Sequence, residues 1–110
     1  MPKIQEMKSV SPQELRTLLN EGKAVLIDVR EPYELDICKI DALHIPMAEV
    51  AANIDKIDRS KTVVIMCRSG KRAEAVVNML TADFEMQDVV NLEGGILAWI
   101  EQIDTHLETY

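Results

Sequence analysis

Hydrophobic positions along the chain fall into short runs, separated by segments in which they recur at helical spacing. The run AVLIDV at residues 24–29 is almost wholly apolar, as in a strand buried on both faces of a parallel sheet. TVVIM at 62–66 is rich in β-branched residues, which favour strands, and DVVNL at 88–92 predicts another. Two shorter segments, ALHIP at 42–46 and KIQEM at 3–7, predict a short strand and an edge strand.

Helices are predicted between these strands. In SVSPQELRTLLNEGK, Ser11 is a natural N-cap, Pro12 suits the first helical position, Glu14 completes a capping box, and Gly22 ends the helix. Further helical segments are one or two turns in EPYELD (31–36), a helix in AEVAANIDKI (48–57), one carrying Ala73, Val76, Val77 and Leu80, and one carrying Ile96, Ile100, Ile103 and Leu107.

Short apolar strands that alternate with helices predict an α/β fold. Its centre is a mostly parallel sheet of about five strands, joined by right-handed crossovers and flanked by helices. A length of 110 residues fits one domain over residues 1–110, with no internal repeat and no linker.

Composition narrows the classes of partner. A net charge of −7 argues against nucleic acid or an anionic membrane surface, because both bind cationic faces. No apolar stretch approaches the roughly 18 residues of a membrane-spanning helix, and the first residues lack the apolar core of a secretory signal. With only two cysteines, a disulfide framework is not expected, and the prediction is a cytoplasmic protein with free thiols.

The segment CRSGKR, residues 67–72, is the strongest candidate for chemistry. Cys67 follows the best strand, at the sheet edge where parallel α/β folds carry their sites. Gly70 permits a tight turn, and a helix is expected to begin near Lys71 or Arg72. Main-chain N–H groups, about half a unit of positive charge at the helix N-terminus, and three cations including Arg68 would then hold Cys67 as a thiolate. The alternative is a small buried apolar residue.

Two chemistries use a cysteine in a loop lined by amide groups: attack on a phosphate ester, and acceptance of a sulfur atom as a persulfide. A phosphoryl group brings three nonbridging oxygens, whereas the outer sulfur of a persulfide is a single atom. Four residues separate Cys67 from Arg72, and cysteine-dependent phosphatases place their arginine one position further on, where this chain has Ala73. The tighter loop favours sulfur.

Four stretches together resemble the rhodanese family of sulfurtransferases in its small single-domain form. LIDVREPYEL resembles the family's Asp-Val-Arg motif, ALHIPM its Gly-Ala-x-Asn-Ile-Pro segment, CRSGKRA its six-residue active loop, and NLEGGILAW its Gly-Gly-x-x-Ala-Trp motif. The four occur in the family's order and cover most of the chain.

The resemblance implies that Cys67 accepts sulfane sulfur from a small anionic donor such as thiosulfate or from a polysulfide. The persulfide then passes its sulfur to cyanide, to a small thiol or to an acceptor protein, without any cofactor or metal. Arg68 and Lys71 would attract the donor, while Arg72 braces the loop or completes its field. The residues expected to bind substrate are those of the loop: Arg68, Ser69, Gly70, Lys71 and Arg72.

Five residues outside the loop are expected to support it. Asp28 ends a strand beside the loop and is predicted to hydrogen-bond nearby loop amides. Arg30 and Glu34, four positions apart, predict an ion pair across a helical turn. On the resemblance, Gly94 and Gly95 form a tight turn that borders the catalytic pocket.

The chain departs from the family pattern in places, and rival functions follow from the same residues. CKI at 38–40 stands where the family has Gly-His-Ile, Asp41 replaces a glycine, and His44 replaces an asparagine. Cys38 is either a redox partner of Cys67 or, as we favour, a packed thiol. Zinc binding by these thiols and His44 is not favoured by their spacing. The rival functions are a noncatalytic binding module and a phosphatase-like enzyme.

Overall fold

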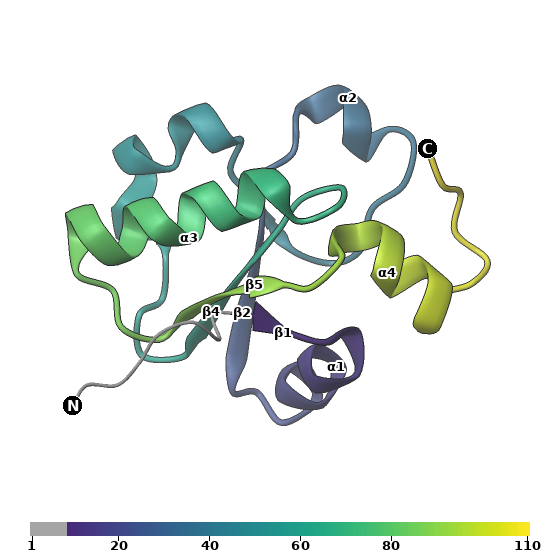
Figure 1. Ribbon diagram of the computed structural model, residues 1–110, viewed down its shortest axis with the longest axis horizontal. Helices are drawn as coiled ribbons and strands as arrows, with labels where there is room; N and C mark the ends of the chain where they lie inside the picture. Colours follow the sequence, from purple (N-terminus) through teal and green to yellow (C-terminus); the bar gives the residue numbers. More distant parts are fainter. Residues whose placement is uncertain (1–8) are drawn as a thin grey trace.

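A single parallel sheet forms the centre of the molecule. The computed structural model describes residues 9–110, and the edge strand predicted at residues 3–7 lies outside this range. The strands, in spatial order β1-β5-β4-β2-β3, all run parallel, so the predicted α/β architecture is confirmed (Figure 1). Their bounds are β1 Ser9–Val10, β2 Ala24–Asp28, β3 Leu43–His44, β4 Thr62–Met66 and β5 Val89–Leu92.

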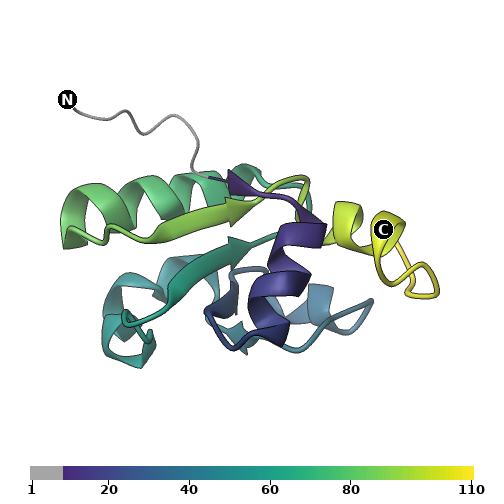
Figure 2. The same ribbon diagram turned by 90° about the horizontal axis from the view of Figure 1, so that it is seen from below.

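Helices cover both faces of the sheet. On one side α1 (Pro12–Asn20) and α4 (Gly95–Gln102) pack together, away from α3 (Lys71–Phe84) on the other side (Figure 2). A single turn, α2 (Pro32–Leu35), follows β2. Among residues 9–110, no helix is long and apolar enough to span a bilayer.

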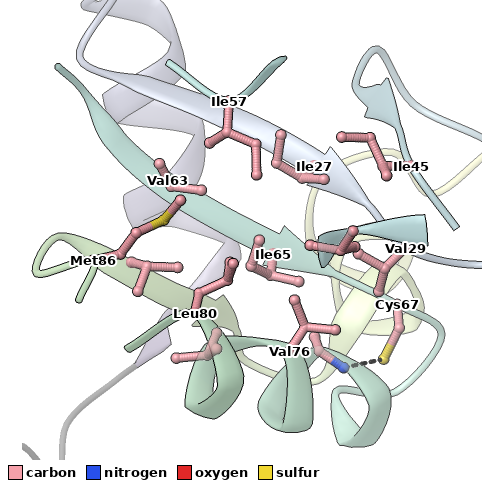
Figure 3. Packing of buried hydrophobic residues seen from close by; sticks show 14 residues of the cluster. Ile27, Val29, Ile45, Ile57, Val63, Ile65, Cys67, Val76, Leu80 and Met86 are labelled. Atoms are coloured by element: carbon pink, nitrogen blue, oxygen red, sulfur yellow. Dashed lines mark hydrogen bonds between the residues drawn. The ribbon is translucent and has the colours of Figure 1, made fainter. Parts of the chain in front are cut away.

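The two faces of the sheet explain the uninterrupted apolar runs. In β4, Val64 and Met66 join the hydrophobic cluster beneath α1 and α4, whereas Val63 and Ile65 point into the cluster beneath α3 (Figure 3). Because successive side chains of a strand alternate between faces, a strand covered on both sides needs apolar residues at every position.

The start of α1 follows the predicted capping box. The Ser11 hydroxyl accepts a hydrogen bond from the Glu14 amide at 3.1 Å, and the Glu14 carboxylate accepts one from the Ser11 amide at 2.7 Å. Pro12 occupies the first turn and Gly22 takes a left-handed conformation just after the helix, at φ 69°.

The helix predicted at residues 48–57 is present only as 3₁₀ helix, in two pieces. Two 3₁₀ helices occupy this region, η1 (Met47–Glu49) and η2 (Ala51–Lys56). Asn53 leaves the helical region at φ −121°, and its side-chain amide donates to the Glu49 carbonyl oxygen at 2.8 Å. This side-chain bond takes a carbonyl that an α-helix would bond to a main-chain amide, so the helix is interrupted.

The last helix is shorter than its apolar stripe predicts. Helix α4 ends at Gln102, and the Trp99 carbonyl accepts from the amides of both Ile103 and Asp104. The Trp99 indole also donates to the Asp104 carboxylate at 2.9 Å, which fixes the turn that ends the helix. Leu107 still packs against the cluster, but from the segment that follows the helix.

Candidate active site

The cysteine loop lies at the carboxyl end of the central strand. Cys67 follows β4 directly, and α3 begins at Lys71, as predicted. Since β4 lies between β2 and β5, the residues after those two strands approach the loop from opposite sides. Gly70, at φ 112°, makes the turn into α3, and a side chain there would be strained.

Two main-chain amides point at the sulfur of Cys67. The N–H of Gly70 lies 3.1 Å from Sγ, and that of Ala73, in the first turn of α3, lies 3.4 Å away. Figure 3 shows the sulfur turned toward the start of this helix. The residue is only 1% exposed and also packs against the apolar cluster beneath α3. Burial and amide contact therefore coexist at Cys67, whose sulfur accepts from both main-chain N–H groups.

Gly95 allows the start of α4 to approach the main chain of the cysteine loop closely. A Cβ atom at this position would overlap the carbonyl group of Arg68 and lie 2.6 Å from the carbonyl oxygen of Cys67. The close approach lets α4 hold the loop by its first amides: Ile96 donates to the Cys67 carbonyl at 2.9 Å and Leu97 to that of Arg68 at 3.2 Å. The turn predicted at Gly94 and Gly95 thus orients the loop through its carbonyl groups.

The three cations of the loop have different surroundings. Arg72 forms a two-pronged ion pair with Glu34, at 2.7 and 2.9 Å. Arg68 extends outward to the main-chain oxygen of Tyr110. Lys71 is exposed and lines a hollow of about 310 Å³ beside the loop, together with Ser69 and other residues. Of these three cations, Lys71 alone has neither an ion pair with a carboxylate nor a hydrogen bond to Tyr110 within residues 9–110.

The predicted ion pair between Arg30 and Glu34 was wrong. Arg30 is fully buried and forms a two-pronged pair with Asp28, with its Nη2 2.8 Å from Asp28 Oδ2. Its contact with Glu34 is to the main-chain oxygen, at 3.4 Å. The α2 turn directs the Glu34 side chain toward Arg72 instead. Asp28 accepts a hydrogen bond from the Arg30 amide at 3.0 Å. This amide belongs to the loop after β2, and not to the cysteine loop.

These pairs shift the protonation of their members. Hydrogen bonds from Arg72 lower the pKa of Glu34 to about 2, against the opposing effect of burial. The hydrogen bonds to Glu34 raise the pKa of Arg72. Burial opposes the charge of Arg30, but its bonds to Asp28 and Tyr110 outweigh burial and raise its pKa. Arg30, Glu34 and Arg72 are therefore charged throughout the neutral range.

Sequence reasoning missed two contributors to the site. The Tyr110 hydroxyl accepts from Arg30 at 3.0 Å and donates to Glu34 at 2.8 Å. The Asn91 side-chain amide, from β5, donates to the Gly70 carbonyl at 3.2 Å and so supports the turn. Asn91 opens the quoted stretch NLEGGILAW but gives no sign there of its bond to Gly70, and Tyr110 lies outside every quoted motif.

Cys38 and Cys67 pack in different hydrophobic clusters. Cys38 belongs to the cluster beneath α1 and α4, whereas Cys67 belongs to the cluster on the opposite face of the sheet. Both thiols are free and buried. His44 contacts the carbonyl oxygen of Arg30 at 2.8 Å. Within residues 9–110, no group of three or more potential ligands gathers to hold a metal ion.

The fold and the loop define a class of α/β domain built around a cysteine at the end of its central strand. Residues 11–102 match the family model of the Rhodanese-like domain, and the chain belongs to this family.

Relatives carry the name sulfurtransferase. MoeZ of Mycobacterium tuberculosis, an adenylyltransferase/sulfurtransferase by name, is 38% identical over 107 residues, which cover 93% of this chain but 27% of MoeZ. YtwF of Bacillus subtilis, a sulfurtransferase by name, is 35% identical over 86% of this chain and 91% of its own. The structure of human single-domain sulfurtransferase TSTD1 superimposes with a TM-score of 0.71 at 30% identity, covering 86% of this chain and 96% of that one.

Proposed function

We propose that this protein is a sulfurtransferase that carries sulfane sulfur as a persulfide on Cys67. The observation that carries the proposal is the pair of amides, from Gly70 and Ala73, aimed at Sγ at the start of a helix. Such amides stabilise negative charge, first on the thiolate and then on the terminal sulfur of the persulfide. The relatives named as sulfurtransferases support the same activity.

With thiosulfate as donor, the Cys67 thiolate attacks the outer sulfur. A sulfur–sulfur bond forms on Cys67, the bond between the two sulfurs of thiosulfate breaks, and sulfite leaves with the electron pair. In the second step an acceptor thiolate, or cyanide, attacks the terminal sulfur of the persulfide, and the Cys67 thiolate is released. Dividing the transfer in this way is nucleophilic covalent catalysis and needs no net oxidant or reductant.

The surrounding cations divide the remaining tasks. Arg72 braces the loop, because both ends of its guanidinium fork are engaged by Glu34. Lys71 is exposed and attracts the anionic donor, whereas Arg68, also outward, is bonded to Tyr110. The sulfur acceptor, which is a small thiol, cyanide or the thiol of an acceptor protein, approaches Cys67 from the same side as the donor. Two free cysteines suit a reducing, cytoplasmic setting, which we include in the proposal.

The test is the intact mass of the protein after incubation with thiosulfate or a polysulfide. We expect a gain of one sulfur atom that a thiol reductant removes. Cys67→Ser should abolish the gain, whereas Cys38→Ser, the matched control on the opposite face of the sheet, should keep it. If neither donor adds sulfur, or if the sulfur is found on Cys38, the proposal fails. Absence of any adduct favours a binding module, and release of phosphate from an aryl phosphate favours a phosphatase.

A further inference from the structure

Tyr110 reaches the active-site cluster from the segment that follows α4. This segment turns back from the helix toward α2, as Figure 1 shows in yellow. The Tyr110 hydroxyl bridges two buried charged side chains: it accepts a hydrogen bond from Arg30 at 3.0 Å and donates one to Glu34 at 2.8 Å. Burial raises the pKa of Tyr110, so the hydroxyl keeps the proton that it donates to Glu34. The residue is therefore anchored to the same carboxylate that pairs with Arg72 of the loop.

Tyr110 also engages Arg68, the residue directly after Cys67. The Nε of Arg68 donates to the main-chain oxygen of Tyr110 at 2.8 Å, and Nη2 donates to the same oxygen. The guanidinium carbon lies 5.0 Å from the centre of the Tyr110 ring, within the range of a cation–π contact. Arg68 is otherwise an exposed side chain.

The edge of a guanidinium that carries Nε–H and one Nη–H is a fork that binds oxyanions through two parallel hydrogen bonds. In Arg68 this fork is filled by an oxygen of the protein itself. The Tyr110 ring covers one face of the Arg68 guanidinium, and the Tyr110 main-chain oxygen occupies its fork, so an anionic donor would meet both groups there. Donor and tail therefore compete for one cation.

We propose that Tyr110 is a specificity-determining residue, which withholds Arg68 from anionic sulfur donors and so shifts the preference of Cys67 toward donors without charge. This inference rests on the proposed function for its biological meaning, but the competition itself is a property of the two side chains. The hydroxyl and the ring hold the main-chain oxygen in place at Arg68.

The segment between α4 and Tyr110 has anchors of its own. Its first part is fixed independently, by the bond from Trp99 to Asp104 and by Leu107, which packs on the core. Tyr110→Ala also removes the contacts of the side chain with Arg30, Glu34 and the core cluster, so the assignment of its effect to Arg68 needs the double variant described below.

Alkylation of Cys67 tests the proposal without any sulfur donor. The rates with iodoacetate, an anion, and with iodoacetamide, its neutral counterpart, are measured by mass spectrometry of the Cys67 peptide. The rate with iodoacetate divided by the rate with iodoacetamide measures how strongly nearby cations attract an anionic reagent. We expect Tyr110→Ala to raise this ratio about threefold, the effect of one exposed charge made available. Tyr110→Phe, which loses only the hydroxyl, should lie between, and Thr109→Ala, an exposed neighbour, should match the parent protein.

A double variant assigns the effect to Arg68. In an Arg68→Gln background, Tyr110→Ala should no longer change the ratio, because the cation it releases is absent. A ratio that is unchanged or lower in Tyr110→Ala overturns the proposal, as does a rise that persists without Arg68. If thiosulfate leaves no sulfur on Cys67 while the alkylation ratios behave as expected, the proposed function fails and the competition stands.

Discussion

The ion pair between Glu34 and Arg72 ties the α2 turn to the cysteine loop, and its contribution to folding can be worked out. Hydrogen bonds from Arg72 lower the pKa of Glu34 from 4.5 to about 2. Since a tenfold change in proton affinity corresponds to about 1.4 kcal/mol, this amounts to about 3 kcal/mol. The Arg72 side chain is 34% exposed, so solvent weakens the pair, and we expect about 2 kcal/mol.

The substitution Glu34→Gln removes the charge and keeps the shape of the side chain. We expect the free energy of unfolding to fall by about 2 kcal/mol at pH 7, measured by urea denaturation. Glu101→Gln, an exposed position on α4, is the matched control and should change stability by less than about 0.5 kcal/mol.

The pH dependence gives the sharper test. In the folded protein Glu34 stays ionised down to about pH 2, whereas in the unfolded chain it takes up a proton near pH 4.5. The stability that it provides is therefore complete above that range and is lost as the pH falls through it. The difference between the parent protein and Glu34→Gln should shrink between pH 5 and pH 3. A difference that stays constant over this interval would refute the electrostatic explanation and leave only a packing effect.

Further substitutions test other parts of the structure. Gly95→Ala should destabilise the protein by more than about 2 kcal/mol and slow sulfur loading, because its Cβ would collide with the carbonyl group of Arg68. Gly22→Ala, which has the same left-handed backbone but open space around it, should cost only about 1 kcal/mol; thermal unfolding compares the two, and equal losses would contradict the steric argument. Ser11→Ala should cost about 1 kcal/mol in urea denaturation through loss of the cap, and no loss would mean that the capping bond adds nothing. Arg72→Lys keeps the charge but loses the fork, so we expect slower loading of Cys67 at unchanged thiosulfate affinity; weaker donor affinity instead would make Arg72 a binding residue.

Most of the fold could be predicted from the sequence because its signals are local. The run at 62–66 is apolar and β-branched, and its end at Cys67 follows from the glycine and the cations after it. The capping residues around Ser11 define where α1 begins. Local signals failed where a side chain ends or interrupts a helix: the Asn53 amide takes a main-chain oxygen in η2, and the Asp104 carboxylate accepts from the Trp99 indole after α4.

The partners of the buried ions were not predicted: Glu34 meets Arg72 only when α2 and the cysteine loop come together, and Arg30 turns back to Asp28, two residues before it. Arg30 and Glu34 have the spacing of a helical pair, but the helix begins only at Pro32, and each side chain turns to a different partner. The approach of Tyr110 has no signal in the sequence at all, because it joins residues 80 positions apart through a segment without regular structure.

The way in which Arg30 is held has a consequence for how relatives can diverge. Two of its hydrogen bonds go to main-chain oxygens, those of Glu34 at 3.4 Å and Cys38 at 3.0 Å. A carbonyl group is the same whatever side chain accompanies it, so this stretch can exchange its exposed residues, such as Asp36 and Lys39, while the arginine keeps its anchors. Evolution can thus change the exposed residues of this stretch without disturbing the anchors of Arg30.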